Sequence, residues 1–419
     1  MKKLLITLLF AAGLLTACTT ATHTAKKREN TGKAILGISP GKKEITVQAV
    51  TADGSPVQVE GCTVTELPSG EEIFLEALGD AVVLKGDITE LDCSSNELTA
   101  LDVRGLTALQ TLYCDNNLLT SIDLHGLTAL QTLYCDNNRL SSLDVRQLTA
   151  LQWLKCYNNQ LSVLHVQDLT SLRLLYCDDN RLTSLNLHGL SGLWFLHCDN
   201  NQLTSLDLKG LTALRWLKCR DNQLTTLNVQ GLTSLQVLEC DSNRLTSLNL
   251  HGLSGLQVLN CDNNQLTSLD LKGVTALQTL DCYNNRLTVL DIHGLSRLAG
   301  LYCSRNRLKE HALIQIINSL PERRTDEETE AVFYTEEDNR SEGNYTDWSS
   351  SAGLQAAIKT ARAKNWTLYK QVGEEDFEEL EVTEESERGT GFGGAAVPID
   401  KTYTVKGVIE TAMFIGWQN

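Results

Sequence analysis

The chain has 419 residues, of which 42% are hydrophobic and 21% are charged, and this composition indicates a soluble globular or repeat protein with an ample core. Aspartate and glutamate outnumber lysine and arginine by 52 to 36, which gives a formal net charge of -16 at pH 7. Because the phosphates of a nucleic acid would be repelled, this charge argues against nucleic acid as a partner.

Residues 1–17 have the features of an export signal. Lys2 and Lys3 precede an apolar run at 4–15, which is too short to span a membrane. The stretch 15–18 reads L-T-A-C and resembles the bacterial lipobox, in which the cysteine is acylated and becomes the mature N-terminus. We therefore expect lipidation at Cys18 and membrane attachment through an N-terminal lipid only; a cleaved signal peptide with a chance cysteine is the alternative. Residues 18–33 are polar and are expected to form a flexible tether.

Residues 34–86 predict a small β cap for the repeats that follow. Turn residues, such as D-G-S-P at 53–56, separate short apolar runs at 45–50, 57–59, 62–67, 73–75 and 82–84. A cap is needed because the first coil of a solenoid otherwise exposes its apolar core. Cys62 lies in one of the runs and is expected to be a small buried hydrophobe.

A 21-residue unit is repeated from 87 to 308. Eleven of the thirteen cysteines recur at this spacing: Cys93, Cys114, Cys135, Cys156, Cys177, Cys198, Cys219, Cys240, Cys261, Cys282 and Cys303. An asparagine follows each of them three positions later, from Asn96 to Asn306. The unit at 109–129 reads L-Q-T-L-Y-C-D-N-N-L-L-T-S-I-D-L-H-G-L-T-A, which is the leucine-rich-repeat pattern with cysteine in the third apolar position.

This pattern predicts an α/β-type solenoid, a right-handed leucine-rich-repeat coil with a concave parallel sheet. The alternation L-Y-C-D at 112–115 predicts one short strand per coil, with leucine and cysteine inward. About ten residues remain for the return path, so turns and 3₁₀ pieces are expected on the convex side. The buried asparagines are expected to satisfy backbone groups. A recurrent glycine suggests a positive φ, which is not obligatory where Gln147 and Asp168 replace it.

A different composition begins after Leu308 and predicts a C-terminal α/β cap at 309–372. Helices are expected at 311–320 and 350–364, and strands at 332–334 and 366–369. Nine carboxylates in 373–387 predict a solvated acidic linker, followed by a short β tail within 373–419.

The cysteine ladder predicts packed, reduced thiols. Disulfides are the alternative in an exported protein, but neighbouring parallel strands orient their Cβ atoms alike, which suits a disulfide poorly. Zinc is disfavoured because a row of sulfurs along a sheet lacks tetrahedral clustering, and no metal site is expected. His125, His188, His251 and His293 share one convex column, which duplication of a three-repeat block explains better than metal binding.

The outward strand positions hold the candidate binding residues. Aromatic side chains gather there in the second to seventh coils, although only 5% of the chain is aromatic. Contiguous aromatics bordered by charge are typical of interfaces; mutual packing of neighbouring side chains is the alternative. Trp153 and Trp216 are the expected anchors, with local positive charge that could guide an acidic partner. The predicted ligand-binding face comprises Tyr113, Tyr134, Trp153, Lys155, Tyr157, Tyr176, Phe195, His197, Trp216, Lys218 and Arg220.

The unit L-x-C-x-x-N-x-L at 112–119 and its copies resemble the cysteine-type leucine-rich-repeat proteins of bacterial surfaces, the internalin-J-like family. S-L-P at 319–321 and K-N-W at 364–366 look like the closing segment of surface proteins of Gram-negative anaerobes, including immunoreactive antigens of an oral species. The resemblance implies adhesion to a protein on a host or bacterial surface, invasion or biofilm formation, without catalysis or a cofactor. The lipobox in place of a C-terminal wall anchor implies an outer-membrane lipoprotein, exposed at the cell surface.

The residues also bear on two other functions, catalysis and sugar binding. No cysteine follows Cys303, and the metalloprotease pattern H-E-x-x-H and the phosphate-binding pattern G-x-x-x-x-G-K do not occur, so we expect no enzyme. Aromatic platforms also suit sugars, so a glycan- or nutrient-capturing surface lipoprotein is the alternative function.

Overall fold

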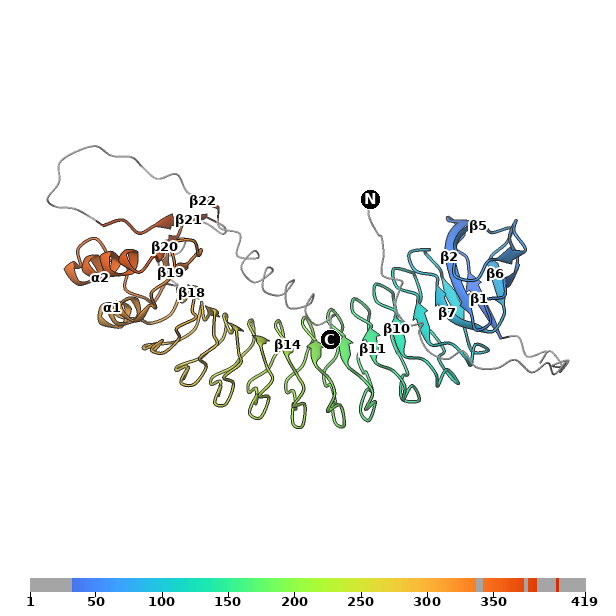
Figure 1. The fold of residues 1–419 in the computed structure, drawn as a ribbon, viewed down its shortest axis with the longest axis horizontal. Coiled ribbons are helices and arrows are strands. Elements are labelled where there is room, and N and C mark those ends of the chain that lie inside the picture. Colours follow the sequence, from blue (N-terminus) through green and yellow to red (C-terminus); the bar gives the residue numbers. More distant parts are fainter. Residues whose placement is uncertain (1–31, 337–341, 373–375, 383–396, 399–419) are drawn as a thin grey trace, which may run out of the picture. The chain divides into compact units, whose positions relative to one another are not determined.

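The computed structural model describes residues 32–336, 342–372, 376–382 and 397–398. The expected signal peptide, Cys18, most of the tether and most of the C-terminal tail lie outside the described residues. Within the described ranges, no helix has both the length and the apolar character needed to cross a membrane. Figure 1 shows stacked coils that begin at a β-rich cap and end at a cap with two helices.

The N-terminal cap is built from short antiparallel strands. They are β1 (Lys33–Gly37), β2 (Glu44–Thr51), β3 (Val57–Glu60), β4 (Glu66–Leu67), β5 (Glu72–Glu76) and β6 (Ala81–Lys85). One sheet has the order β4-β3-β6-β1-β8, where β8 (Ala100–Asp102) comes from the first coil. β2 pairs with β5 on one side and with β7 (Ile88–Asp92) on the other, which joins the cap to the solenoid sheet. Cys62 is buried, as expected.

The solenoid contributes one strand per coil to a parallel sheet (Figure 1). After β7 come β9 (Thr111–Tyr113), β10 (Thr132–Tyr134), β11 (Trp153–Lys155), β12 (Leu174–Tyr176), β13 (Phe195–His197), β14 (Trp216–Lys218), β15 (Val237–Glu239), β16 (Val258–Asn260), β17 (Thr279–Asp281) and β18 (Gly300–Tyr302). Each strand pairs with the next without a register shift, so residues one repeat apart lie side by side. The strands share the concave face and turns form the opposite one, which confirms the leucine-rich-repeat solenoid expected from the sequence.

The interior of the solenoid holds leucine and cysteine. All eleven ladder cysteines are buried and free, as expected from the sequence. The thiol of Cys198, for example, donates to the carbonyl of Lys218 in the next coil at 3.4 Å. Burial raises the pKa of this thiol well above its usual value, which disfavours the reactive thiolate.

The asparagine ladder joins each coil to its neighbour. Asn201 Nδ2 donates to the carbonyl of Cys177 in the preceding coil at 3.0 Å, and its Oδ1 accepts from the N–H of Leu182 at 2.9 Å. The first asparagine, Asn96, instead bonds both the N–H and the carbonyl of Thr46 in β2. The expected role of these residues in satisfying backbone groups is confirmed, and the ladder also ties the solenoid to the cap.

Positive φ angles recur at two positions of the coil. The glycine column adopts them from Gly126 (φ 85°) to Gly294 (φ 83°). Of the two residues that replace glycine there, Asp168 has a positive φ of 65°, so the expectation that a replacing residue could avoid it is wrong for Asp168, whereas Gln147 has no positive φ, as expected. The second position, two residues after the cysteine, is occupied mainly by asparagine and aspartate, as at Asn200 (φ 49°), because these residues tolerate the left-handed region best after glycine.

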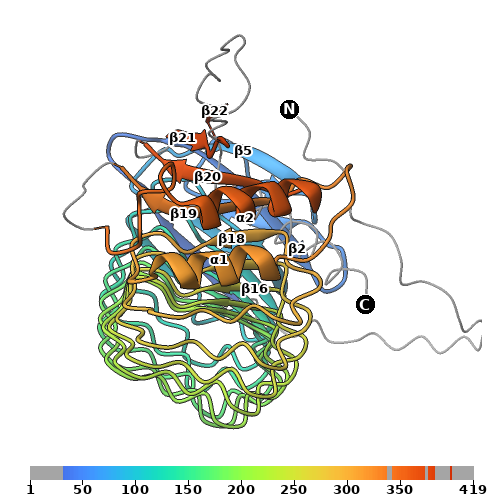
Figure 2. The same ribbon diagram turned by 90° about the vertical axis from the view of Figure 1, so that its left-hand side faces the viewer.

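The C-terminal cap continues the sheet. It consists of α1 (Glu310–Ser319), β19 (Glu330–Thr335), α2 (Ala352–Ala363), β20 (Thr367–Gln371), β21 (Asp376–Glu379) and β22 (Val397–Pro398). β19 and β20 extend the parallel ladder beyond β18, and α1 packs beside α2 (Figure 2). Asn344 takes over the ladder role, because its Oδ1 accepts from Leu308 N–H at 2.8 Å and its Nδ2 donates to the carbonyl of Cys303 at 2.9 Å.

The acidic segment expected to be a linker contains a strand. β21 pairs antiparallel with β20, with Phe377 opposite Gln371. Phe377 is buried whereas its acidic neighbours are exposed, so D-F-E-E fits a strand that turns one side chain toward the apolar interior. The expectation of an irregular segment is therefore wrong for residues 376–379.

Candidate functional site

The in-register strands arrange the outward side chains in columns on the concave face. The first outward column is Thr111, Thr132, Trp153, Leu174, Phe195, Trp216, Val237 and Val258. The second outward column is Tyr113, Tyr134, Lys155, Tyr176, His197, Lys218 and Glu239. The third, directly after the cysteines, is Asp115, Asp136, Tyr157, Asp178, Asp199, Arg220 and Asp241. All predicted ligand-binding residues therefore lie on one face, on β9 to β14 and the turns that follow.

The first outward column is packed more tightly than the sequence indicated. Phe195 and Trp216 are each only 2% exposed, and they form one apolar cluster with Leu174, Val237 and Val258. The rings of Phe195 and Trp216 lie 6.3 Å apart. Trp216 therefore packs within the cluster and does not act as an exposed anchor. The alternative of mutual side-chain packing is correct for these two residues.

The second outward column keeps its aromatic rings half-buried. The rings of Tyr113 and Tyr134 are tilted, with centroids 5.0 Å apart. Lys155 Nζ lies 4.3 Å from the centroid of the Tyr134 ring and 5.5 Å from that of Tyr176, in cation–π geometry. The rings of Tyr157 and Tyr176 are 6.3 Å apart. These contacts hold the side chains in place while leaving part of each ring accessible to a partner.

The charged residues at β13 and β14 are paired within the face. Arg220 Nε lies 2.7 Å from Asp199 Oδ2, and Lys218 Nζ lies 3.1 Å from Glu239 Oε1. His197 bridges two carboxylates, with Nε2 2.8 Å from Asp199. The positive charge that the sequence indicated at Lys218 and Arg220 is therefore balanced locally.

Two carboxylates on the same face are held away from water. Burial raises the pKa of Asp178 to about 6, against the opposing effect of His197. Burial raises the pKa of Asp241 to about 7, against the opposing charge of Arg220. Near neutral pH, these groups change charge more readily than ordinary aspartates.

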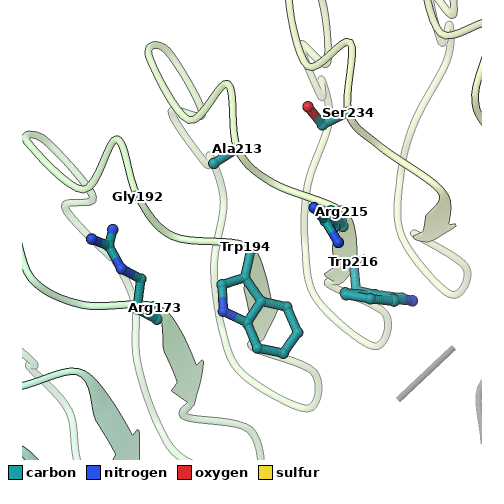
Figure 3. Close-up of a pocket in the computed structure, with 7 residues that line it drawn as sticks. All are labelled: Arg173, Gly192, Trp194, Ala213, Arg215, Trp216 and Ser234. Carbon is teal, nitrogen blue, oxygen red and sulfur yellow. The ribbon is translucent and has the colours of Figure 1, made fainter. Parts of the chain in front are cut away.

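A pocket of about 400 Å³ lies where the chain enters the strands, and the sequence prediction missed it. Arg173, Gly192, Trp194, Ala213, Arg215, Trp216 and Ser234 line it (Figure 3). The pre-strand column, one residue before each strand, is Gln131, Gln152, Arg173, Trp194, Arg215 and Gln236, joined by backbone hydrogen bonds of 2.8–3.0 Å. The sequence held one sign of this pocket: the pre-strand column changes from glutamine to R-W-R at 173, 194 and 215.

Trp194 is the half-buried centre of an aromatic cluster. Its ring meets Trp153 edge-on at 6.2 Å, Phe195 at 6.1 Å and Trp216 at 5.3 Å. Offset and edge-to-face pairs of this kind are favourable beyond the area that they bury. Trp153 and Trp194 are therefore the tryptophans of this face that remain accessible.

Two features of the described ranges bear on metal binding and nucleophilic catalysis. These ranges contain no group of three or more histidine, cysteine or acidic side chains placed to hold a metal ion. Residues 37–41 read G-I-S-P-G, which matches the nucleophile pattern G-x-S-x-G. They join two strands, β1 and β2, whereas the nucleophile elbow requires a strand followed by a helix.

Comparison with known proteins agrees with the geometry. A family model described as Leucine Rich repeats (2 copies) matches residues 107–147, and no curated protein matches the sequence. The functional domain of InlJ from Listeria monocytogenes, which includes a cysteine ladder, is 32% identical with a TM-score of 0.54. That match covers 62% of this chain and 56% of the other, little more than half its length. YopM, a leucine-rich effector protein from Yersinia pestis, is 26% identical with a TM-score of 0.51, over 62% of this chain and 67% of the other.

These similarities support a leucine-rich-repeat solenoid that resembles the internalins. Solenoids of this type are scaffolds that present an extended surface to protein partners, typically without catalysis.

Proposed function

We propose that the protein is a surface adhesin that binds a protein on a host or bacterial surface through the concave face of β10 to β14. It acts without catalysis or a cofactor, in adherence, invasion or biofilm formation. The similarity to the functional domain of InlJ, which includes a cysteine ladder, supports this proposal. The likeness of S-L-P at 319–321 and K-N-W at 364–366 to surface antigens of oral Gram-negative anaerobes favours the same role.

The observation that carries the proposal is the aromatic patch made by Trp153, Trp194, Tyr176 and Tyr134, with Lys155 among the rings. Tryptophan and tyrosine dominate the binding energy of protein interfaces because they remove a large area from water while losing little side-chain entropy. Because their neighbours hold these rings in place, a partner meets a preorganised surface.

The test is adhesion of purified protein to host cells and to bacterial cells, with Trp153→Ala and Trp194→Ala combined. The sequence indicated Trp153 and Trp216 as anchors, but Trp216 is buried, so the test uses Trp194 in its place. We expect adhesion to weaken at least tenfold, about 1.4 kcal/mol. His188→Ala, on the turn side and exposed, is the matched control and should leave adhesion unchanged.

The same assay separates the two functions that the sequence left open. Protease treatment of the cells should remove binding, whereas enzymatic removal of glycans should not. Binding that survives protease treatment and disappears with the glycans would favour a glycan-capturing lipoprotein. Normal adhesion of a folded double variant would place the binding surface elsewhere.

We further propose that Cys18 carries the lipid and that the protein is an outer-membrane lipoprotein exposed at the cell surface. The stretch L-T-A-C at 15–18 supports this. A fatty-acid analogue fed to cells should label the wild-type protein but not Cys18→Ala, and equal labelling of both would contradict the proposal.

A further inference from the structure

Arg173 and Arg215 differ from the other cations of the concave face. Lys218 and Arg220 are paired with carboxylates, and Lys155 lies over tyrosine rings. Arg173 and Arg215 are exposed, and no carboxylate in the described ranges forms an ion pair with either of them. In a chain of net charge -16 they form a local site of unbalanced positive charge.

The fold holds these two guanidinium groups on either side of one aromatic ring. Arg173, Trp194 and Arg215 follow one another in the pre-strand column, with successive backbone bonds of 3.0 and 2.9 Å. Two coil spacings of about 4.8 Å separate the arginine backbones by roughly 10 Å. Figure 3 shows the Trp194 indole between the two side chains.

Gly192 makes room for one of them. A Cβ atom at this position would stand only 1.4 Å from Arg173 Nη1, so the guanidinium occupies the space of a missing side chain. Neighbouring coils carry serine or alanine at the equivalent positions, Ser171 and Ala213. The backbone of the coil therefore accepts a side chain here, and glycine at 192 favours the observed position of Arg173.

From this arrangement we infer that the pocket binds an acidic polypeptide segment of the adhesion partner, an inference that rests on the proposed function. The guanidinium of each arginine receives one carboxylate through charge-assisted hydrogen bonds, and an apolar side chain between the two carboxylates packs on Trp194. Residues three apart in a polyproline II segment lie on the same side and about 9 Å apart, which matches the arginine spacing. The cavity of about 400 Å³ accommodates such side chains.

The probe is a labelled peptide in which glutamate recurs at every third position among proline and leucine, compared with the same peptide carrying glutamine. The variants are Arg173→Gln with Arg215→Gln, which restore the residue that this column carries at Gln152 and Gln236. We expect the double variant to lose at least tenfold in affinity for the glutamate peptide. Its affinity for the glutamate peptide should then be no higher than its affinity for the glutamine peptide. Added salt should weaken wild-type binding more than binding by the variant.

Two further variants make the result specific. Arg181→Gln removes the same charge from the coil of Arg173, in a column that carries glutamine at 160 and 202, and should leave peptide binding unchanged. Gly192→Ala should fold normally, displace the Arg173 guanidinium and weaken binding. An equal loss with Arg181→Gln, or equal affinity of the wild type for both peptides, would overturn the inference.

An acidic polysaccharide, polygalacturonate, forms the third arm of the binding experiment. Binding of polygalacturonate but not of the glutamate peptide, lost in the double arginine variant, would assign the pocket to glycans and overturn the inference. Adhesion then separates this inference from the proposed function. If Trp153→Ala with Trp194→Ala abolishes adhesion while the arginine variant adheres normally, the concave face is the binding surface and the acidic partner is wrong.

Discussion

Replacement of Asn201 by alanine tests whether the asparagine ladder stabilises the contact between coils. Asn201 is buried and makes four hydrogen bonds: its Nδ2 donates to the carbonyls of Cys177, Cys198 and Asp199, and its Oδ1 accepts from Leu182 N–H. Alanine removes all four and leaves a small polar cavity between two coils.

The expected loss of stability depends on whether the backbone groups bonded to Asn201 keep other hydrogen-bond partners. The carbonyl of Cys177 also accepts from Asn180 Nδ2, that of Cys198 from Asn222 Nδ2, and that of Asp199 from Asp179 N–H. Leu182 N–H alone loses its acceptor. An unpaired buried donor costs about 1–3 kcal/mol, and each of the other lost bonds contributes about 0.5–1 kcal/mol. We therefore expect the free energy of unfolding to fall by about 3 kcal/mol or more.

Denaturant unfolding measures the total loss, and hydrogen exchange followed by mass spectrometry locates it. The loss should centre on residues 177–203, because each repeat of a solenoid contacts only its neighbours. The exposed neighbour provides the control, Gln202→Ala, which should change the unfolding free energy by less than about 0.5 kcal/mol. If Asn201→Ala is no more destabilising than this control, the ladder only occupies space and the reasoning is wrong.

Three further predictions concern the ladder thiols and the concave face. Cys198→Ala should lower the unfolding free energy by about 1 kcal/mol through a small cavity, and serine should lower it more because its hydroxyl is buried; denaturant unfolding measures both. Trp216→Ala should cost about 3 kcal/mol or more, whereas Trp153→Ala should cost less because Trp153 is only half-buried; thermal unfolding compares them. The raised pKa of Asp241, about 7, means that the folded state binds its proton more tightly than the unfolded chain, so stability rises as pH falls through 7. Between about pH 8 and pH 5 the wild type should gain about 2 kcal/mol relative to Asp241→Asn in pH-dependent unfolding.

Each of these predictions has a result that contradicts it. Recovery of most ladder cysteines as disulfides after denaturing alkylation would disprove reduced packing around Cys198. Equal destabilisation by the two tryptophan variants would mean that Trp216 is as accessible as Trp153. A constant stability difference between the wild type and Asp241→Asn across this pH range would show that Asp241 has an ordinary pKa. Asn228→Ala, on the exposed turn side, controls for surface effects.

The sequence was sufficient to predict the solenoid because each coil repeats the same local instructions. A spacing of 21 fixes the register, since one repeat must lie beside the next for the leucine and cysteine columns to stack. The positions of β9 to β18, the inward cysteines and the inward asparagines all follow from that single period. Burial of Asn201 was predictable for the same reason.

The strands that the sequence missed depend on distant partners. β1 follows a polar stretch, and its neighbours β6 and β8 are far along the chain, so no local pattern identifies it. β21 lies in a run of carboxylates and forms because β20 offers an unpaired edge and Phe377 has an apolar site to enter. Tertiary pairing outweighs local composition in both cases.

The sequence predicted that the candidate residues lie on the concave face, but it did not predict how deeply each of them is buried. Alternation assigns Phe195 and Trp216 to the outward face, but it does not show that side chains of adjacent coils, about 4.8 Å apart, cover each other when they are large. Trp194 was missed because it precedes its strand, and the alternation of side chains assigns a face only within a strand. Comparison of each column across coils, rather than along one strand, identifies Trp194 and the two arginines beside it.

The two faces of the solenoid therefore differ in how freely they can change. The turn side is repeated so closely that L-N-L-H-G-L-S at 185–191 recurs without change at 248–254, whereas the strands that follow read F-L-H and V-L-N. Strand-face residues can vary because the stacking of coils depends on the inward columns. The first outward column is an exception, since Leu174, Phe195 and Trp216 pack against one another across coils. Residues of the second outward column and the pre-strand column can therefore be substituted one coil at a time to change binding specificity. Residues of the first outward column must be substituted together in neighbouring coils.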